Sequence, residues 1–163
     1  MQPETYELRP ATPADAPALV AVMKSVAGEG LWVRTEWPFD EDERLRRYSA
    51  SLESGRARCI VAERAGRPIG QMTLFEDGDV ADLGMFVERE SRGRGVGRAL
   101  LGAAVELALQ RGVQTLQLEV YAHNAAALAL YRNAGFAPYG ETYAENRRSG
   151  ETFDVIRMRK KVR

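Results

Sequence analysis

The chain of 163 residues contains a single cysteine and a single histidine. One cysteine excludes an internal disulfide bond and a metal site built from several cysteines. Cys59 lies in the apolar run Cys59-Ile60-Val61-Ala62, which is typical of a small buried thiol more than of a nucleophile. His123 has no second metal-binding side chain beside it in the sequence, so the residue types predict no metal site.

The chain also lacks an excess of charge of either sign and any long hydrophobic run. Lys plus Arg and Asp plus Glu each total 23, so no overall field favours nucleic acid or a membrane surface. No stretch approaches the length of a membrane span, and residues 1–10 carry charges in place of the apolar segment of a signal peptide. The composition therefore predicts a cytoplasmic protein with neither nucleic acid nor a membrane as its partner.

The sequence shows no repeat, low-complexity tract or long linker, which predicts a single domain over residues 1–163. Helical spacing and capping residues predict helices at 12–28, 40–53 and 95–110, and a short one between Asn124 and Gly135. Strand patterns occupy residues 6–9, 59–63, 69–75, 80–87, 115–121, 136–145 and 152–158. This order predicts an α/β (mixed α+β) fold, with one mixed sheet of about seven strands and helices on both faces.

The most informative stretch is a glycine-rich turn between the strand at 80–87 and the helix at 95–110. Gly93, Gly95 and Gly97 alternate there, and glycines at the start of a helix let a ligand approach the backbone and its free N–H groups. These donors and the helix dipole favour a phosphate or pyrophosphate. Four arginines add local positive charge that the whole chain does not have: Arg89, Arg92, Arg94 and Arg98.

Two other glycine motifs do not match this turn. A dinucleotide-binding G-x-G-x-x-G motif requires a third glycine where the chain has Arg98 or, one glycine later, Leu100. A P-loop requires Gly-Lys-Ser or Gly-Lys-Thr, and the sequence contains neither.

The turn and the segments that follow it resemble the GNAT superfamily of N-acetyltransferases. The matching segments are Arg92-x-x-Gly95-x-Gly97, Leu118-Glu119-Val120, Asn124-x-x-Ala127-x-x-Leu130-Tyr131 and Gly135-Phe136. The resemblance implies a GNAT fold, in which the parallel strands 4 and 5 of the sheet splay apart and pantetheine lies between them. It also implies acetyl-CoA, or another acyl-CoA, as cosubstrate.

The resemblance further implies which residues contact the cosubstrate. Tyr131 is expected to donate a proton to the CoA sulfur, and Asn124 is expected to contact pantetheine. A backbone N–H of the strand near Met85 could bind the thioester oxygen as it becomes an oxyanion. The full expected set is Met85, Phe86, Val87, Arg92, Gly93, Arg94, Gly95, Val96, Gly97, Arg98, Asn124, Ala127 and Tyr131.

Two features of the strands favour an opening in the sheet independently of the resemblance. Gly84 lies inside the strand at 80–87, where a glycine either marks a bulge or is simply tolerated. In the strand at 115–121, Gln117, Glu119 and Tyr121 share one face. A central strand covered by helices is apolar on both faces, so a polar face predicts an opening lined by these side chains.

Acetyl transfer to an amine requires a group that removes a proton from it. A lysine side chain has a pKa of about 10.4 and an α-amine a pKa of about 8, so most of either amine is protonated at neutral pH. Glu119 is the first candidate for the base and Asp82 the second, and a water molecule is a third possibility.

The resemblance to GNAT proteins also implies that the first two helices and the segment between them wall the acceptor pocket. The predicted acceptor-binding residues are Glu29, Trp32, Glu36 and Trp37 from this segment, together with Tyr121. Acids beside tryptophans suit a cationic amine, although the aromatic side chains could instead seal the edge of the core while the acids face water.

These features leave the acceptor open. A small-molecule amine, an amino acid or a protein N-terminus each remains compatible, as does a homodimer. A second function class also remains, in which the chain is a catalytically silent acyl-CoA-binding sensor or regulatory module. Tyr131 and Glu119 favour the enzyme, because a sensor needs neither an acid for the thiolate nor a base for the amine.

Overall fold

A computed structural model describes residues 5–163; residues 1–4 of the charged N-terminal stretch lie outside the described part. The helices are α1 (Ala16–Gly28), α2 (Glu41–Ser54), α3 (Val96–Gln110) and α4 (Ala125–Asn133), with short 3-10 turns at Pro13–Asp15 and Arg89–Ser91. The strands are β1 (Glu7–Pro10), β2 (Ala57–Arg64), β3 (Arg67–Asp77), β4 (Val80–Val87), β5 (Thr115–Tyr121), β6 (Ala137–Pro138), β7 (Tyr143–Asn146) and β8 (Thr152–Lys161).

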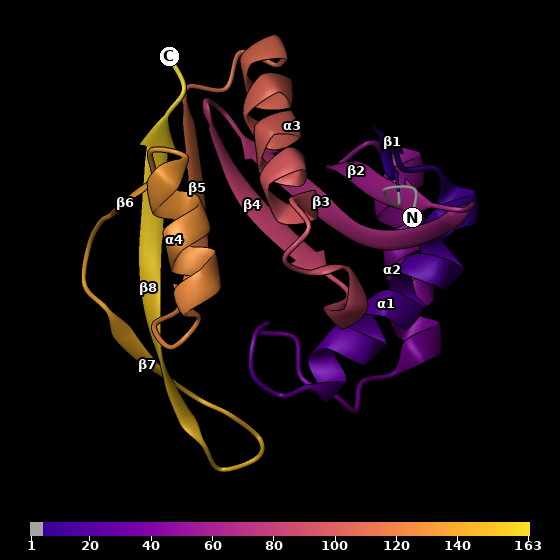
Figure 1. The fold of residues 1–163 in the computed structure, drawn as a ribbon, viewed down its shortest axis with the longest axis horizontal. Helices are drawn as coiled ribbons and strands as arrows, with labels where there is room; N and C mark the ends of the chain where they lie inside the picture. The colour runs from indigo at the N-terminus through magenta and orange to yellow at the C-terminus, as the bar shows by residue number, and fades with distance from the viewer. Residues whose placement is uncertain (1–4) are drawn as a thin grey trace.

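All these strands join one mixed sheet in the order β1-β2-β3-β4-β5-β8-β6, and β7 also pairs with β8 (Figure 1). The β4–β5 pair is parallel, and the other pairs are antiparallel. This mixed sheet confirms the predicted fold class.

The predicted strand at 136–145 is wrong as a single element, because it divides into β6 and β7. Gly140, between them, has a left-handed backbone with φ of 64°, which no strand adopts. Pro138 ends β6 and has no N–H with which to continue the ladder. The sheet therefore has eight strands among the described residues, against about seven expected.

Helices cover both faces of the sheet, as the sequence predicts (Figure 1). On β3, Met72 and Leu74 belong to the main core with α3, whereas Gln71 and Thr73 point to the face that carries α1 and α2. The main core joins α3 and α4 to the centre of the sheet and includes Leu100, Leu101, Ala104, Leu116, Leu118, Val120, Leu128 and Tyr131. The opposite face retains polar side chains on its central strands, and the cavity described below lies there.

An ion-pair cluster fixes the start of α1 to the edge of the sheet. The guanidinium group of Arg9, on β1, donates to both carboxylate oxygens of Asp15 at 2.8 and 2.7 Å and also pairs with Glu63 on β2. Asp15 also accepts from the N–H of Thr12 at 2.7 Å. The hydrogen bonds from Arg9 lower the pKa of the buried Asp15 carboxyl to about 2. The predicted helical start at residue 12 is thus a capped 3-10 turn that leads into α1.

Over residues 5–163, no helix combines the length and the apolar character needed to cross a membrane.

Candidate active site

A cavity of about 1000 Å³ opens where β4 and β5 diverge. The two strands pair only between Val80 and Thr115, Ala81 and Leu116, and Asp82 and Gln117. Beyond these three pairs, the rest of both strands lines the cavity. The expected splayed pair of parallel strands is therefore confirmed.

The opening does not arise from a bulge at Gly84. β4 pairs with β3 in one unbroken register from Val80 opposite Asp77 to Val87 opposite Gly70. A Cβ placed on Gly84 would meet no described atom within 4 Å. Gly84 is thus a tolerated glycine that lines the cavity, and the bulge considered from the sequence is wrong.

The glycine-rich turn lies at one end of this cavity. Gly93 and Gly95 both have left-handed backbones, with φ of 73° and 85°, which make the sharp turn into α3. The first hydrogen bond of α3 runs from the Ala99 N–H to the Gly95 carbonyl at 3.0 Å. The N–H groups that precede it belong to Val96, Gly97 and Arg98. The first N–H groups of α3 therefore point outward from the N-terminus of the helix.

Arg92 holds the turn against its neighbours. Its Nη atoms donate to both carboxylate oxygens of Glu29 at 2.9 and 2.7 Å, and its Nε donates to the Val87 carbonyl at 2.9 Å. The hydrogen bonds from Arg92 lower the pKa of Glu29. Arg92 thus joins the end of α1 to the end of β4. Glu29, an expected acceptor-binding residue, has its charge compensated by Arg92 and does not line the cavity.

The other residues expected at the cosubstrate fall into two groups. Those that line the cavity are Met85, Phe86, Val87, Arg92, Gly93, Gly97, Asn124, Ala127 and Tyr131. Arg94 and Gly95 are exposed, Val96 is buried in the core, and Arg98 lines a second hollow of about 500 Å³ between α3 and α4.

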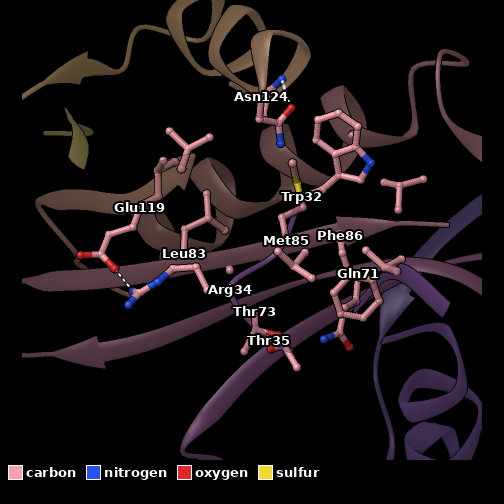
Figure 2. A pocket seen from close by; sticks show the side chains of 18 of the residues that line it. Trp32, Arg34, Thr35, Gln71, Thr73, Leu83, Met85, Phe86, Glu119 and Asn124 are labelled. Carbon is pink, nitrogen blue, oxygen red and sulfur yellow. Dashed lines mark hydrogen bonds and ion pairs between the residues drawn. The ribbon is translucent and has the colours of Figure 1, made fainter. Parts of the chain in front are cut away.

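Tyr131 and Asn124 reach the cavity from α4. Tyr131 is 8% exposed and packs against Phe136, with ring centroids 5.8 Å apart. Desolvation raises the pKa of its hydroxyl to about 12, so the group is protonated near neutral pH. Asn124 caps α4 by accepting from the Ala127 N–H at 3.2 Å, and it lines the cavity together with Met85 and Trp32, which Figure 2 labels.

Glu119 lies in a network of donors at the opposite end of the opening. One carboxylate oxygen forms an ion pair with Arg34, drawn as a dashed line in Figure 2. The other accepts from the Tyr143 hydroxyl at 3.0 Å and from Arg157 Nε at 3.4 Å. The Glu119 side chain remains 30% exposed. Asp82, the second candidate base, is exposed and accepts from Gln117 Nε2 at 2.7 Å.

The segment between α1 and α2 contributes one of the two predicted tryptophans to the cavity. Trp32 lines it, whereas Trp37 is 38% exposed and packs edge-on against Phe39 at 5.2 Å. Glu36 accepts from the Arg148 N–H at 2.8 Å and pairs with Arg147 at 3.5 Å. Glu36 and Trp37 thus lie outside the lining.

Tyr121 lines the cavity and connects it to the β7–β8 hairpin. Its hydroxyl donates to Glu145 at 2.7 Å and accepts from Arg147. Desolvation, together with the bond to Glu145, raises its pKa to about 12. Arg147, whose side chain is 3% exposed, also donates to the Val33 carbonyl at 3.1 Å. The hairpin therefore holds the 29–40 segment across the polar face of the sheet.

Several lining residues were not predicted from the sequence: Arg34, Thr35, Arg44, Tyr48, Ser51, Gln71 and Thr73. Two signals could have found some of them. Arg44, Tyr48 and Ser51 recur at helical spacing on α2, and Gln71 and Thr73 alternate on β3 with apolar residues. His123 also lines the cavity, where its Nε2 contacts the Leu31 carbonyl at 2.6 Å.

Two relatives align with most of this chain. The L-methionine sulfoximine/L-methionine sulfone acetyltransferase of Pseudomonas paraeruginosa is 26% identical over 157 residues, 93% of this chain and 91% of the relative. The [ribosomal protein bS18]-alanine N-acetyltransferase of Escherichia coli K12 is 50% identical over 105 residues, 64% of each chain.

Solved structures share the fold. The ribosomal-protein-alanine N-acetyltransferase of Brucella melitensis superposes with a TM-score of 0.83 at 31% identity, over 95% of this chain and 99% of that one. The yncA protein of Salmonella typhimurium, solved with its cofactor acetyl-CoA, superposes with a TM-score of 0.84 at 22% identity, over 98% of this chain and 95% of that one.

The family model described as acetyltransferase (GNAT) family matches residues 27–136, from the end of α1 to Phe136 after α4. This span contains the glycine-rich turn, the splayed strands and Tyr131, which together form most of the cavity. The chain is therefore an acyltransferase that belongs to the GNAT family.

Proposed function

We propose that the protein is an N-acetyltransferase that transfers the acetyl group of acetyl-CoA to a primary amine by direct attack within a ternary complex. The observation that carries this proposal is the cavity itself, which joins the glycine-rich turn, the unpaired edge of β4, Tyr131 and a polar face of the sheet. A cosubstrate entering at the turn would meet an acceptor entering over the polar face.

The start of α3 fits a pyrophosphate group. A Cβ on Gly97 would lie 3.4 Å from Leu130 Cδ2 and 3.9 Å from Met85 Cε, so a side chain at this position would fill the space between α3, α4 and β4. The N–H groups of the first turn and the helix dipole favour an anion there. Acetyl-CoA, when bound, supplies an acetyl group activated as a thioester.

The unpaired edge of β4 supports a site for the acyl oxygen. Beyond Asp82, β4 has a strand partner on its β3 side only. Alternate N–H groups of β4 therefore face the cavity and can donate to the thioester oxygen as it gains negative charge.

The reaction needs two proton transfers besides the attack. The amine nitrogen forms a bond to the acyl carbon while the carbon–sulfur bond breaks. Tyr131 protonates the departing thiolate, and Glu119 takes the proton that the amine loses, directly or through water. The products are the N-acetylated amine and free CoA.

The acceptor is a small-molecule amine, an amino acid or a protein N-terminus. Named relatives act on small molecules and on proteins, since one is an L-methionine sulfoximine acetyltransferase and another acetylates an alanine of a ribosomal protein. The acids expected to attract a cationic amine are engaged elsewhere, because Glu29 pairs with Arg92 and Glu36 with Arg147.

Thiol release from acetyl-CoA across a panel of primary amines tests this proposal. We expect amine-dependent thiol release with an N-acetylated product detected by mass spectrometry. Tight binding of acetyl-CoA without turnover of any amine would support the acyl-CoA sensor instead.

A further inference from the structure

Three arginines line the cavity, and they differ in their partners. Arg34 pairs with Glu119 and Glu145, and Arg92 pairs with Glu29. Arg44, on α2, lies over the Phe39 ring with its guanidinium carbon 4.8 Å from the ring centroid. No carboxylate of residues 5–163 forms an ion pair with it. Arg44 therefore lines the cavity without a carboxylate of residues 5–163 at ion-pair distance.

A buried amide lies on the same side of the cavity. Gln71 is 4% exposed, and its Oε1 accepts from the Tyr48 hydroxyl and from Cys59 Sγ, the latter at 3.4 Å. Within the described part of the chain, no group accepts from its Nε2. Figure 2 shows the Gln71 side chain in the pocket. Gln71 thus offers the cavity a donor that has no protein partner.

Arg44 and Gln71 both line the cavity, and α2 connects them through Tyr48. Tyr48, which contacts Gln71, follows Arg44 by four residues and so lies one turn further along the same face of the helix. The guanidinium group and the amide N–H give this wall two donors, beside the hydroxyl groups of Tyr48 and Thr73. Such a site fits an oxyanion, and the planar fork of arginine matches a carboxylate.

This site lies one strand away from the reacting edge of β4. Gln71 is opposite Phe86 in the β3–β4 register, and neighbouring strands are about 4.8 Å apart. A carboxylate held at Gln71 would therefore lie close to an amine at the open edge of β4. In an α-amino acid, a single carbon joins the two groups. On the other side of the cavity lie Asp82, which is exposed, and Glu119, which is held in its ion pair with Arg34.

We propose that the acceptor is a free amino acid and that Arg44 and Gln71 bind its α-carboxylate. The inference rests on the proposed acetyltransferase function and selects one of its three acceptor classes. A protein N-terminus lacks this carboxylate, since its first residue continues into a peptide bond.

The test compares acids with matched amides. The acetylation of the twenty L-amino acids and of their α-carboxamides is measured as kcat/KM for the wild type, Arg44→Gln, Arg44→Lys and a control, Arg46→Gln. Arg46 is exposed on the same helix and does not line the cavity. Thermal unfolding and calorimetric binding of acetyl-CoA show whether each variant is folded.

We expect the wild type to favour its best amino acid over the matching amide by about tenfold or more, the scale of a charge-assisted hydrogen bond. Arg44→Gln should remove this preference by lowering kcat/KM for the acid while the amide changes less than about threefold. Arg44→Lys should retain part of the preference, and Arg46→Gln all of it.

Two results would overturn the carboxylate site: amides acetylated as well as acids by the wild type, or equal losses for both in Arg44→Gln. A short peptide acetylated better than any amino acid would assign the pocket to protein N-termini. Failure of the proposed function looks different, since no acid, amide or peptide would then be acetylated although acetyl-CoA binds.

Discussion

At the scale of single residues, Tyr131 combines burial with access to the cavity. Its ring packs in the main core, and its hydroxyl has no hydrogen-bond partner among residues 5–163. Desolvation raises its pKa to about 12, so the hydroxyl carries its proton near neutral pH. A protonated donor with nothing else to bind is suited to deliver a proton to a thiolate.

Replacement of Tyr131 by Phe removes this proton and keeps the packing. We expect acetyl-CoA affinity to change by a few-fold only, while kcat falls by about 10²-fold or more, the usual contribution of a general acid. Calorimetry and steady-state kinetics measure the two quantities. Full activity of Tyr131→Phe would assign protonation of the thiolate to water or to another side chain.

Glu119 differs from Tyr131 because its carboxylate is held by several donors. The ion pair with Arg34 and the bond from Tyr143 orient it. Within residues 5–163 its Oε2 accepts from Arg34 alone, and a carboxylate oxygen has two acceptor sites, so this oxygen can also take up a proton from the amine or from a water.

The pH profile of kcat/KM separates a base from an orienting group. If Glu119 is the base, kcat/KM of Glu119→Gln falls most near neutral pH. It recovers as the pH approaches the pKa of the free amine, which is about 8 for an α-amine. Tyr143→Phe is the control, because it removes one donor and keeps the carboxylate. A Glu119→Gln profile of wild-type shape and height would transfer the role to Asp82, and Asp82→Asn is then the next variant.

At the scale of elements, the contact between β1 and the start of α1 depends on one buried carboxylate. Asp15 satisfies both the Thr12 N–H and Arg9, and its pKa is about 2 against an ordinary 3.8. A lowered carboxyl pKa stabilises the folded state above the ordinary pKa. This contribution decreases as the pH falls from about 4 toward 2.

Asp15→Asn should therefore destabilise the protein near neutral pH. Lowering the pKa of Asp15 from 3.8 to about 2, at 1.36 kcal/mol per pKa unit, corresponds to about 2 kcal/mol in the free energy of unfolding, which Asp15→Asn should lose. Urea unfolding at pH 7 should show this difference from the wild type, and the difference should become small only as the pH reaches about 2. Asp42→Asn, an exposed residue of α2, should change stability much less. A difference for Asp15→Asn that does not depend on pH would contradict the assignment to its charge.

At the scale of the whole molecule, the sheet consists of two parts with a narrow junction. β1 to β4 form one part and β5 to β8 the other, and only three residue pairs link β4 to β5. Helices α3 and α4 bridge the two parts through the main core (Figure 1). A ligand between the splayed strands would contact both parts at once.

Acetyl-CoA should therefore stabilise the whole fold. At 100 times its Kd, a ligand that binds only the folded state contributes about 2.7 kcal/mol. For a chain of this size that corresponds to a rise in Tm of about 5 to 10 °C. Hydrogen exchange should slow at residues 83–87 and 118–121, which line the opening. Gly97→Asp adds a negative side chain at the start of α3, so it should remove both effects; a Tm shift that persists in this variant would place the cosubstrate elsewhere.

Local sequence patterns were enough to predict most of the elements and the glycine-rich end of the cavity. Strands at 80–87 and 115–121 coincide with β4 and β5, and the glycines before α3 lie at the turn that they predict. These features depend on local periodicity and backbone freedom, which a single segment carries. The polar face of β5 also predicted the opening, because alternation in a strand assigns its faces without knowledge of its neighbours.

Which charged side chains of the cavity are paired with one another depends on contacts between distant parts of the chain. Glu29 and Arg92 are 63 residues apart and Arg34 and Glu119 are 85 apart, so no local pattern pairs them. These pairings compensate the acid that was expected to attract the acceptor and leave Arg44 without a carboxylate partner among residues 5–163. A charge is compensated by whatever lies within a few ångströms of it, and that neighbour is known only once the chain has folded.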